Sequence, residues 1–186
     1  MFIQTEATPN PATLKFLPGR EVLLGEPRDF RNSEDAMVSP LATALFAVPG
    51  VTGVFLGADF ISVTKDTADW GHIKPSILGV IMEHFLAGKP VMADGEHDAD
   101  EAGEEFFDDS DSETVEVIKE LIATRVRPAV AMDGGDITFR GYREGQVYLN
   151  MRGACSGCPS STATLKSGIE NLLRHFVPGV EGVQQV

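Results

Sequence analysis

The sequence is poor in cysteine, and it has neither a long apolar run nor an excess of basic residues. Only two of its 186 residues are cysteine, which excludes the disulfide-rich frameworks of small secreted proteins. No apolar stretch approaches the roughly 20 residues that a membrane-spanning helix requires. The first seven residues, MFIQTEA, lack both the basic start and the apolar core of a signal peptide. We therefore expect a cytoplasmic protein in a reducing compartment, with no membrane partner.

The charge of the chain is strongly one-sided, but the imbalance is local. There are 28 acidic and 15 basic residues, and 11 of the acids lie in residues 94–113, which contain no Lys or Arg. Self-repelling polar segments of this kind cannot bury a core, so residues 91–111 are predicted to form an acidic flexible linker. Two phenylalanines, Phe106 and Phe107, interrupt it and are candidates to dock on a neighbouring domain. The absence of a basic patch argues against nucleic acid as a partner.

The linker divides the chain into two predicted domains, residues 1–90 and residues 112–186. We assign both to the α+β class, as two small α/β-sandwich domains joined by the acidic flexible linker. In the first domain, Pro75 should lie in the first turn of a helix, because a proline further inside removes a hydrogen bond. Residues 70–74 are accordingly predicted to be a lead-in turn. The remaining elements expected in this domain are strands at 2–6, 13–17, 51–56 and 60–64 and helices at 39–48 and up to about 86.

In the second domain, alternating apolar residues predict a hairpin of two strands, 137–142 and 146–151. A helix capped by Ser112 or Thr114 precedes it and should end near Pro128. A turn at 133–136 connects the two, and a helix at 160–176 and a strand at 180–186 follow. The apolar face predicted for the first of these helices consists of Val117, Ile118, Leu121, Ile122 and Val126.

Both cysteines lie in one loop between a predicted strand and a predicted helix, in the sequence RGACSGCPSS of residues 152–161. Thiolates at the spacing of Cys155 and Cys158 can chelate one metal centre or close a small disulfide ring. Pro159 and Ser160 favour a helix start directly after Cys158, which should lower a thiol pKa there. A Cys-x-x-Cys pattern alone is compatible with redox, zinc and iron–sulfur chemistry. The alternative to all three is that both residues are small buried cysteines of the core, with no functional role.

Four stretches of the sequence narrow the choice among these chemistries. Residues 132–137 (MDGGDI) and 153–166 (GACSGCPSSTATLK) resemble the NifU C-terminal-type domain of the Nfu family. Residues 2–11 (FIQTEATPNP) and 13–16 (TLKF) resemble the Nfu N-terminal domain. The resemblance covers nearly the whole chain except the acidic linker. It implies an iron–sulfur cluster scaffold or carrier, not an enzyme, which receives clusters from upstream assembly machinery and delivers them to apo client proteins. Because the start of the sequence does not look like a transit segment, it also implies a protein of the bacterial cytoplasm, or a processed organellar one.

The number of cysteines then constrains how a cluster is held. A [4Fe–4S] cluster normally takes four cysteine ligands, and this chain supplies two, Cys155 and Cys158. We therefore expect a homodimer in which two chains share one cluster, in agreement with what the resemblance implies. A [2Fe–2S] form is left open. The alternatives are a thiol–disulfide oxidoreductase and a zinc-binding structural module completed by dimerisation.

The residues around this site have simpler expected roles. Gly134 and Gly135 are predicted to form a turn with positive φ, and packing beside the cluster is the alternative. Asp133 and Asp136 are predicted to be turn and cap residues. The first domain shows no catalytic constellation, and its expected role is contact with partner proteins.

Overall fold

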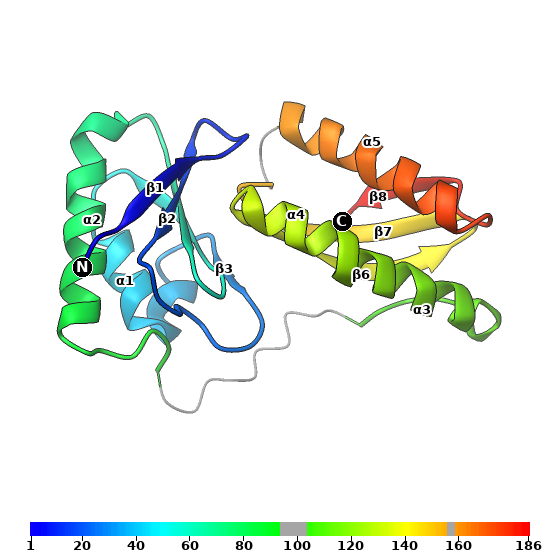
Figure 1. The fold of residues 1–186 in the computed structure, drawn as a ribbon, viewed down its shortest axis with the longest axis horizontal. Coiled ribbons are helices and arrows are strands. Elements are labelled where there is room, and N and C mark those ends of the chain that lie inside the picture. The colour runs from blue at the N-terminus through cyan, green and yellow to red at the C-terminus, as the bar shows by residue number, and fades with distance from the viewer. Residues whose placement is uncertain (94–103, 156–158) are drawn as a thin grey trace. The chain divides into compact units, whose positions relative to one another are not determined.

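The computed structural model describes residues 1–93, 104–155 and 159–186, and it confirms the α+β class with two small domains (Figure 1). The chain divides into two compact units, Met1–Ala99 and Asp100–Val186, each with its own sheet and hydrophobic core. Parts of the predicted linker belong to these units. Ala93 N–H donates to the Val38 carbonyl at 2.9 Å, and Phe106 forms a β-bridge with Gly141.

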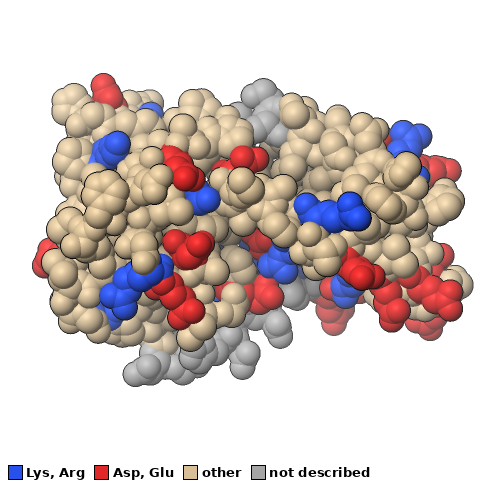
Figure 2. All heavy atoms as spheres, viewed as in Figure 1, with Lys and Arg blue, Asp and Glu red and all other residues tan. Residues whose placement is uncertain are grey.

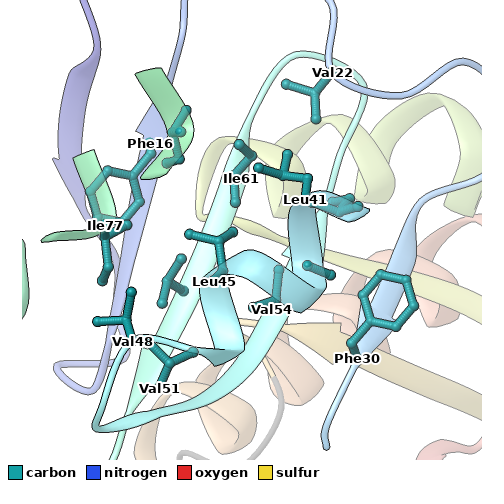
Figure 3. Close-up of a cluster of buried hydrophobic side chains, with 14 of the residues drawn as sticks. Phe16, Val22, Phe30, Leu41, Leu45, Val48, Val51, Val54, Ile61 and Ile77 are labelled. Atoms are coloured by element: carbon teal, nitrogen blue, oxygen red, sulfur yellow. The ribbon is translucent and has the colours of Figure 1, made fainter. Parts of the chain in front are cut away.

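The first unit is an antiparallel five-stranded sheet in the order β1-β2-β5-β4-β3. Its strands are β1 Gln4–Ala7, β2 Thr13–Leu17, β3 Arg28–Phe30, β4 Val51–Leu56 and β5 Ile61–Lys65, and its helices are the 3-10 turn η1 Asp35–Val38, α1 Pro40–Phe46 and α2 Trp70–Leu86. Leu41 and Leu45 of α1 pack with Val54 of β4 and Ile61 of β5 in a single core (Figure 3). The strands predicted at 51–56 and 60–64 are confirmed as β4 and β5, which pair as an antiparallel hairpin, and the helix predicted at 39–48 is confirmed as α1, which Ser39 caps. The short edge strand β3 was not predicted.

The prediction that α2 begins near Pro75 is wrong, because the helix begins at Trp70 with Pro75 inside it. Asp69 explains the early start, since its side chain accepts a hydrogen bond from the Gly71 N–H at 2.9 Å and so caps the helix. The first turn also buries Ile73 in the core. The cap and this burial offset the hydrogen bond that proline cannot donate.

The second unit is a three-stranded sheet in the order β6-β7-β8, packed against helices in one core. Its elements are the 3-10 turn η2 Asp109–Asp111, α3 Ser112–Leu121, the π-helical turn η3 Ile122–Val126, α4 Arg127–Met132, β6 Gly135–Arg143, β7 Gln146–Gly153, α5 Pro159–Phe176 and β8 Gly182–Gln185. The predicted hairpin is confirmed, with Glu144 and Gly145 at positive φ in its turn. The last strand returns as predicted and pairs with β7 in parallel.

The first helix of this unit differs from the prediction at three points. It continues past Pro128, because the wider π-helical turn η3 precedes the proline and the helix resumes as α4. Ser112 and Thr114 are not caps: the helix starts from η2, where the Asp111 N–H donates to the Asp108 carbonyl at 2.8 Å. Val117 is 43% exposed, and Val115 is buried in the core instead.

Charges are unevenly spread over the described surface. Figure 2 shows acidic side chains gathered at the end of the second unit where η2 and α3 begin. Lys and Arg are scattered on the face shown and form no continuous basic surface there. Among the described helices, none combines the length and the apolar character needed to cross a lipid bilayer.

Candidate functional site

Cys155 lies just beyond the end of β7, in the connection to α5. The strand ends at Gly153, whose φ of +65° turns the chain, and α5 begins at Pro159. Cys155 is 6% exposed and packs in the core of the second unit. Cys158, with the lowered thiol pKa expected for it, lies outside the described residues. The structure therefore places one of the two predicted ligands directly between the strand and the helix, as the sequence predicted.

Two hydrogen bonds hold the backbone around Cys155. The Ala154 N–H donates to the Gly134 carbonyl at 3.2 Å, which ties the loop to the turn before β6. The Thr162 hydroxyl donates to the Cys155 carbonyl at 3.0 Å, which ties it to the first turns of α5. The cysteine is thus fixed from both sides by elements of the core, as precise ligand placement requires.

The two glycines before β6 have different roles. Gly134 has a φ of +81° and makes the predicted turn. Gly135 shows no positive φ, so that part of the prediction is wrong. A Cβ atom at Gly135 would lie 2.8 Å from Cys155 Sγ and 2.7 Å from the Arg152 carbonyl oxygen, distances that real Cβ atoms do not show. The alternative expectation was packing beside the cluster, and Gly135 does lie against Cys155, one of the two predicted ligands.

Asp136, predicted as a turn or cap residue, is instead the buried, acidic half of an ion pair with the partly exposed Arg127. It lies in β6 and is 4% exposed. Arg127 donates to both of its oxygens, from Nε to Oδ1 at 2.9 Å and from Nη2 to Oδ2 at 3.0 Å. Such bidentate pairs fix geometry as well as charge. The pair joins the start of α4 to the start of β6, next to the glycine that contacts Cys155.

The surroundings of Cys155 disfavour its thiolate when nothing is bound. Burial raises the pKa of the Cys155 thiol to about 12, and the negative charges of Asp133 and Asp136 act in the same direction. The thiol is therefore protonated at neutral pH, and a metal that binds its sulfur must displace this proton. Within residues 1–93, 104–155 and 159–186, no group of three or more His, Cys, Asp or Glu side chains is arranged to hold a metal ion.

Sequence reasoning found the cysteine but missed Thr162 and the Arg127–Asp136 pair as its support, and it gave close packing of Gly135 only as an alternative. The Asp-Gly-Gly-Asp run is typical of a turn, and nothing local distinguishes its second glycine from its first. Arg127 and Asp136 are nine residues apart, on different elements. Only the fold brings these residues to the cysteine.

Comparisons with known proteins give a separate family match for each of the two units. Residues 3–88 match the family described as "Scaffold protein Nfu/NifU N terminal", and residues 118–184 match the family described as "NifU-like domain". The whole chain is 54% identical to the "NFU1 iron-sulfur cluster scaffold homolog, mitochondrial" of Drosophila sechellia, and it covers 65% of that protein. It is 52% identical to the "NifU-like protein 5, mitochondrial" of Arabidopsis thaliana, and it covers 68% of that protein.

The names of these relatives correct one expectation. The chain spans about two thirds of their length, and both are named as mitochondrial proteins. The expected location in the bacterial cytoplasm is therefore contradicted. The chain belongs to the Nfu/NifU scaffold protein family, because it is more than 50% identical to these relatives over its whole length and matches the two domains in the expected order.

Proposed function

We propose that this chain is an iron–sulfur cluster scaffold or carrier, which binds a [4Fe–4S] cluster through Cys155 and Cys158 of two chains and delivers it to apoproteins. The observation that carries the proposal is the position of Cys155. Its sulfur lies against a backbone position with no side chain, just beyond the end of a strand. The backbone around it is held by two hydrogen bonds, from the Ala154 N–H to the Gly134 carbonyl and from the Thr162 hydroxyl to the Cys155 carbonyl. The names of the relatives support the same function, and they also support a mitochondrial location.

Sharing the cluster between chains suits a protein that must release it. A cluster held by two thiolates from each chain can be lost one ligand at a time to the thiolates of a client protein. Binding requires the Cys155 thiol, whose pKa is raised to about 12, to lose its proton. Cluster uptake should therefore release protons, and low pH should favour cluster loss.

The buried thiol also distinguishes this proposal from the redox alternative. Attacking cysteines of disulfide oxidoreductases have lowered pKa values and are accessible. Cys155 is buried and its pKa is raised. Zinc shares the preference for thiolates, so it must be separated from iron by experiment.

Anaerobic reconstitution of the full chain with iron and sulfide tests the proposal. Native mass spectrometry should show a cluster-bound dimer with about four iron atoms per two chains. Visible charge-transfer absorption should accompany it, which a zinc site would not give. A loaded monomer, or insulin-reducing activity without a chromophore, would contradict the proposal.

Substitution of the ligands gives the matched test. Cys155→Ala and Cys158→Ala should each abolish stable cluster binding, and Ser167→Ala, an exposed change in α5, should leave it unchanged. Circular dichroism of the apo chains establishes whether the fold is retained. A full-strength cluster in either cysteine variant would remove that cysteine from the site.

We further propose that the first unit contacts partner proteins and that the second binds the cluster. No cysteine lies in residues 1–90, so this part of the chain cannot supply a thiolate. Deleting residues 1–90 should leave reconstitution unchanged and slow cluster transfer to at least some client proteins. Equal transfer rates to all clients tested would exclude the contact role.

A further inference from the structure

A short segment of the chain occupies the outer edge of β6, and it belongs to the acidic stretch between the two family domains. Phe106 forms a parallel bridge with Gly141. The Phe106 N–H donates to the Arg140 carbonyl at 3.1 Å, and the Tyr142 N–H donates to the Phe106 carbonyl at 2.9 Å. Residues 105–107, here called the strap, therefore add a very short strand to the open side of the sheet.

The strap is held by its side chains as well as by its backbone. The Phe106 ring lies over Gly141, where an added Cβ would overlap it, and its centroid is 5.0 Å from that of Tyr148. The Arg143 guanidinium lies 5.4 Å from the same centroid, a cation–π distance. Phe107 points the other way and packs on the core, as alternation along a strand requires.

Two basic side chains beside this edge of the sheet favour the binding of an acidic segment. Lys119 forms an ion pair with Glu105 at 2.5 Å, and Arg143 lies above the ring. The edge thus recognises three features at once: an extended backbone, a phenylalanine over Gly141, and an acidic residue just before it. Recognition of a segment by addition to a sheet edge, with a pocket for alternate side chains, is a common mode of peptide binding.

The strap covers only part of the edge. β6 has nine residues, and the strap pairs at Gly141, near one end. No other strand lies beside β6 on this side among the residues that the structure describes. A longer segment could therefore make the same contacts and also pair further along β6.

We propose that the outer edge of β6, with the ring site over Gly141, is a binding site for an extended, acidic, phenylalanine-bearing segment of a partner protein, and that the strap occupies it in the free chain. An attached occupant competes at an effective concentration in the millimolar range, so the site stays closed to weak binders. A partner whose segment pairs along more of β6 displaces the strap. The proposal is independent of cluster binding.

The experiment uses the full chain and a labelled peptide of residues 101–110, EAGEEFFDDS, as the probe. Phe106→Ser removes the ring of the strap and should open the site. The peptide should then bind at least about tenfold more tightly than it binds the unsubstituted chain, because the attached competitor is weakened. Fluorescence anisotropy measures both affinities.

Three controls define the site. Gly141→Ala, added to Phe106→Ser, places a methyl group where the ring must lie and should abolish peptide binding. A peptide with serine in place of its first phenylalanine should not bind. Phe2→Ser removes a phenylalanine that is 84% exposed and should leave the site closed.

Hydrogen exchange keeps the proposal testable if Phe106→Ser folds poorly. Gly141→Ala alone retains Phe106 but displaces its ring, so the Tyr142 amide should exchange at least about tenfold faster, with the Leu149 amide in β7 unchanged. Equal peptide affinity for the unsubstituted and Phe106→Ser chains would overturn the proposal. So would binding that survives Gly141→Ala, or unchanged exchange at Tyr142.

Discussion

Gly135 lies against Cys155 so closely that a methyl group on its α-carbon would come within 2.8 Å of the sulfur. The same methyl group would lie 2.7 Å from the Arg152 carbonyl oxygen, which is backbone and cannot rotate away. A hydrogen atom is the only substituent that fits between β6 and the cysteine. The position of the thiol thus depends on a residue that contributes no side chain.

Gly135→Ala should therefore impair cluster binding without removing a ligand. The added methyl group must push Cys155 or β6 aside, and overpacking of this kind costs about 1–3 kcal/mol of stability. Reconstitution should give less cluster per dimer, and the cluster should be lost faster, as followed by visible absorption. Gly168→Ala is the control, because it lies in α5 with nothing within 4 Å of its added methyl. If both variants load equally, the close packing is not needed for ligation.

The Arg127–Asp136 pair gives a second prediction. Arg127→Met leaves the Asp136 carboxylate buried without this partner, and a buried polar group left unsatisfied costs about 1–3 kcal/mol. Adding Asp136→Asn removes the uncompensated charge, so the double variant should be more stable than Arg127→Met alone. Hydrogen exchange of the β6 and β7 amides measures the stability of the second unit separately from that of the first. If the stability lost in the double variant equals the sum of the losses in Arg127→Met alone and Asp136→Asn alone, the two residues are not coupled.

The sequence predicted those elements whose signals are local. The hairpin of β6 and β7 follows from alternation and a Glu-Gly turn, and the helix α1 follows from Ser39 and Pro40. Cys155 was placed correctly after a strand for the same reason. Phe106 and Phe107 stood out as apolar residues in an acidic stretch, and their expected docking is confirmed.

The errors arise where a distant contact decides the local structure. Pro75 lies inside α2 because the first turn buries Ile73 in the core, whereas the Asp69 cap that accompanies this is a local signal that the prediction passed over. Asp136 resembles a turn residue until the fold brings Arg127 to it. Propensity and spacing carry no information about either contact, so these roles could not be predicted from local patterns.

The thiol itself supports a third prediction. Burial, together with Asp133 and Asp136, raises the pKa of Cys155 from 9.0 to about 12, so its thiolate fraction near pH 8 falls about a thousandfold. Alkylation of Cys155 by iodoacetamide in the apo chain should therefore be far slower than alkylation of a free cysteine peptide. Peptide mapping by mass spectrometry distinguishes label on Cys155 from label on Cys158. Urea should restore the ordinary rate, and a fast reaction in the folded chain would contradict the buried position.

The last prediction concerns the pH dependence of the first unit, through His84. This residue is 4% exposed in α2, and its Nε2 lies 3.0 Å from the Pro90 carbonyl oxygen. Burial lowers the pKa of His84 below its ordinary value of 6.5, and the positive charge of Lys89 adds to this, although hydrogen bonds to the backbone oppose it. The unfolded chain consequently binds a proton more readily than the folded chain.

The sign of the effect follows from that difference. Well above pH 6.5 His84 is neutral in both states, and its protonation takes no stability from the first unit. As the pH falls below 6.5, protonation stabilises the unfolded chain first, so stability is lost until the folded-state pKa is passed. Trp70, the only tryptophan, packs on the core of this unit, so urea unfolding followed by its fluorescence reports on this unit. His84→Gln should flatten the loss between pH 7 and pH 5, whereas His72→Gln, an exposed change in the same helix, should retain it. Equal slopes in the two variants would mean that another group causes the pH dependence.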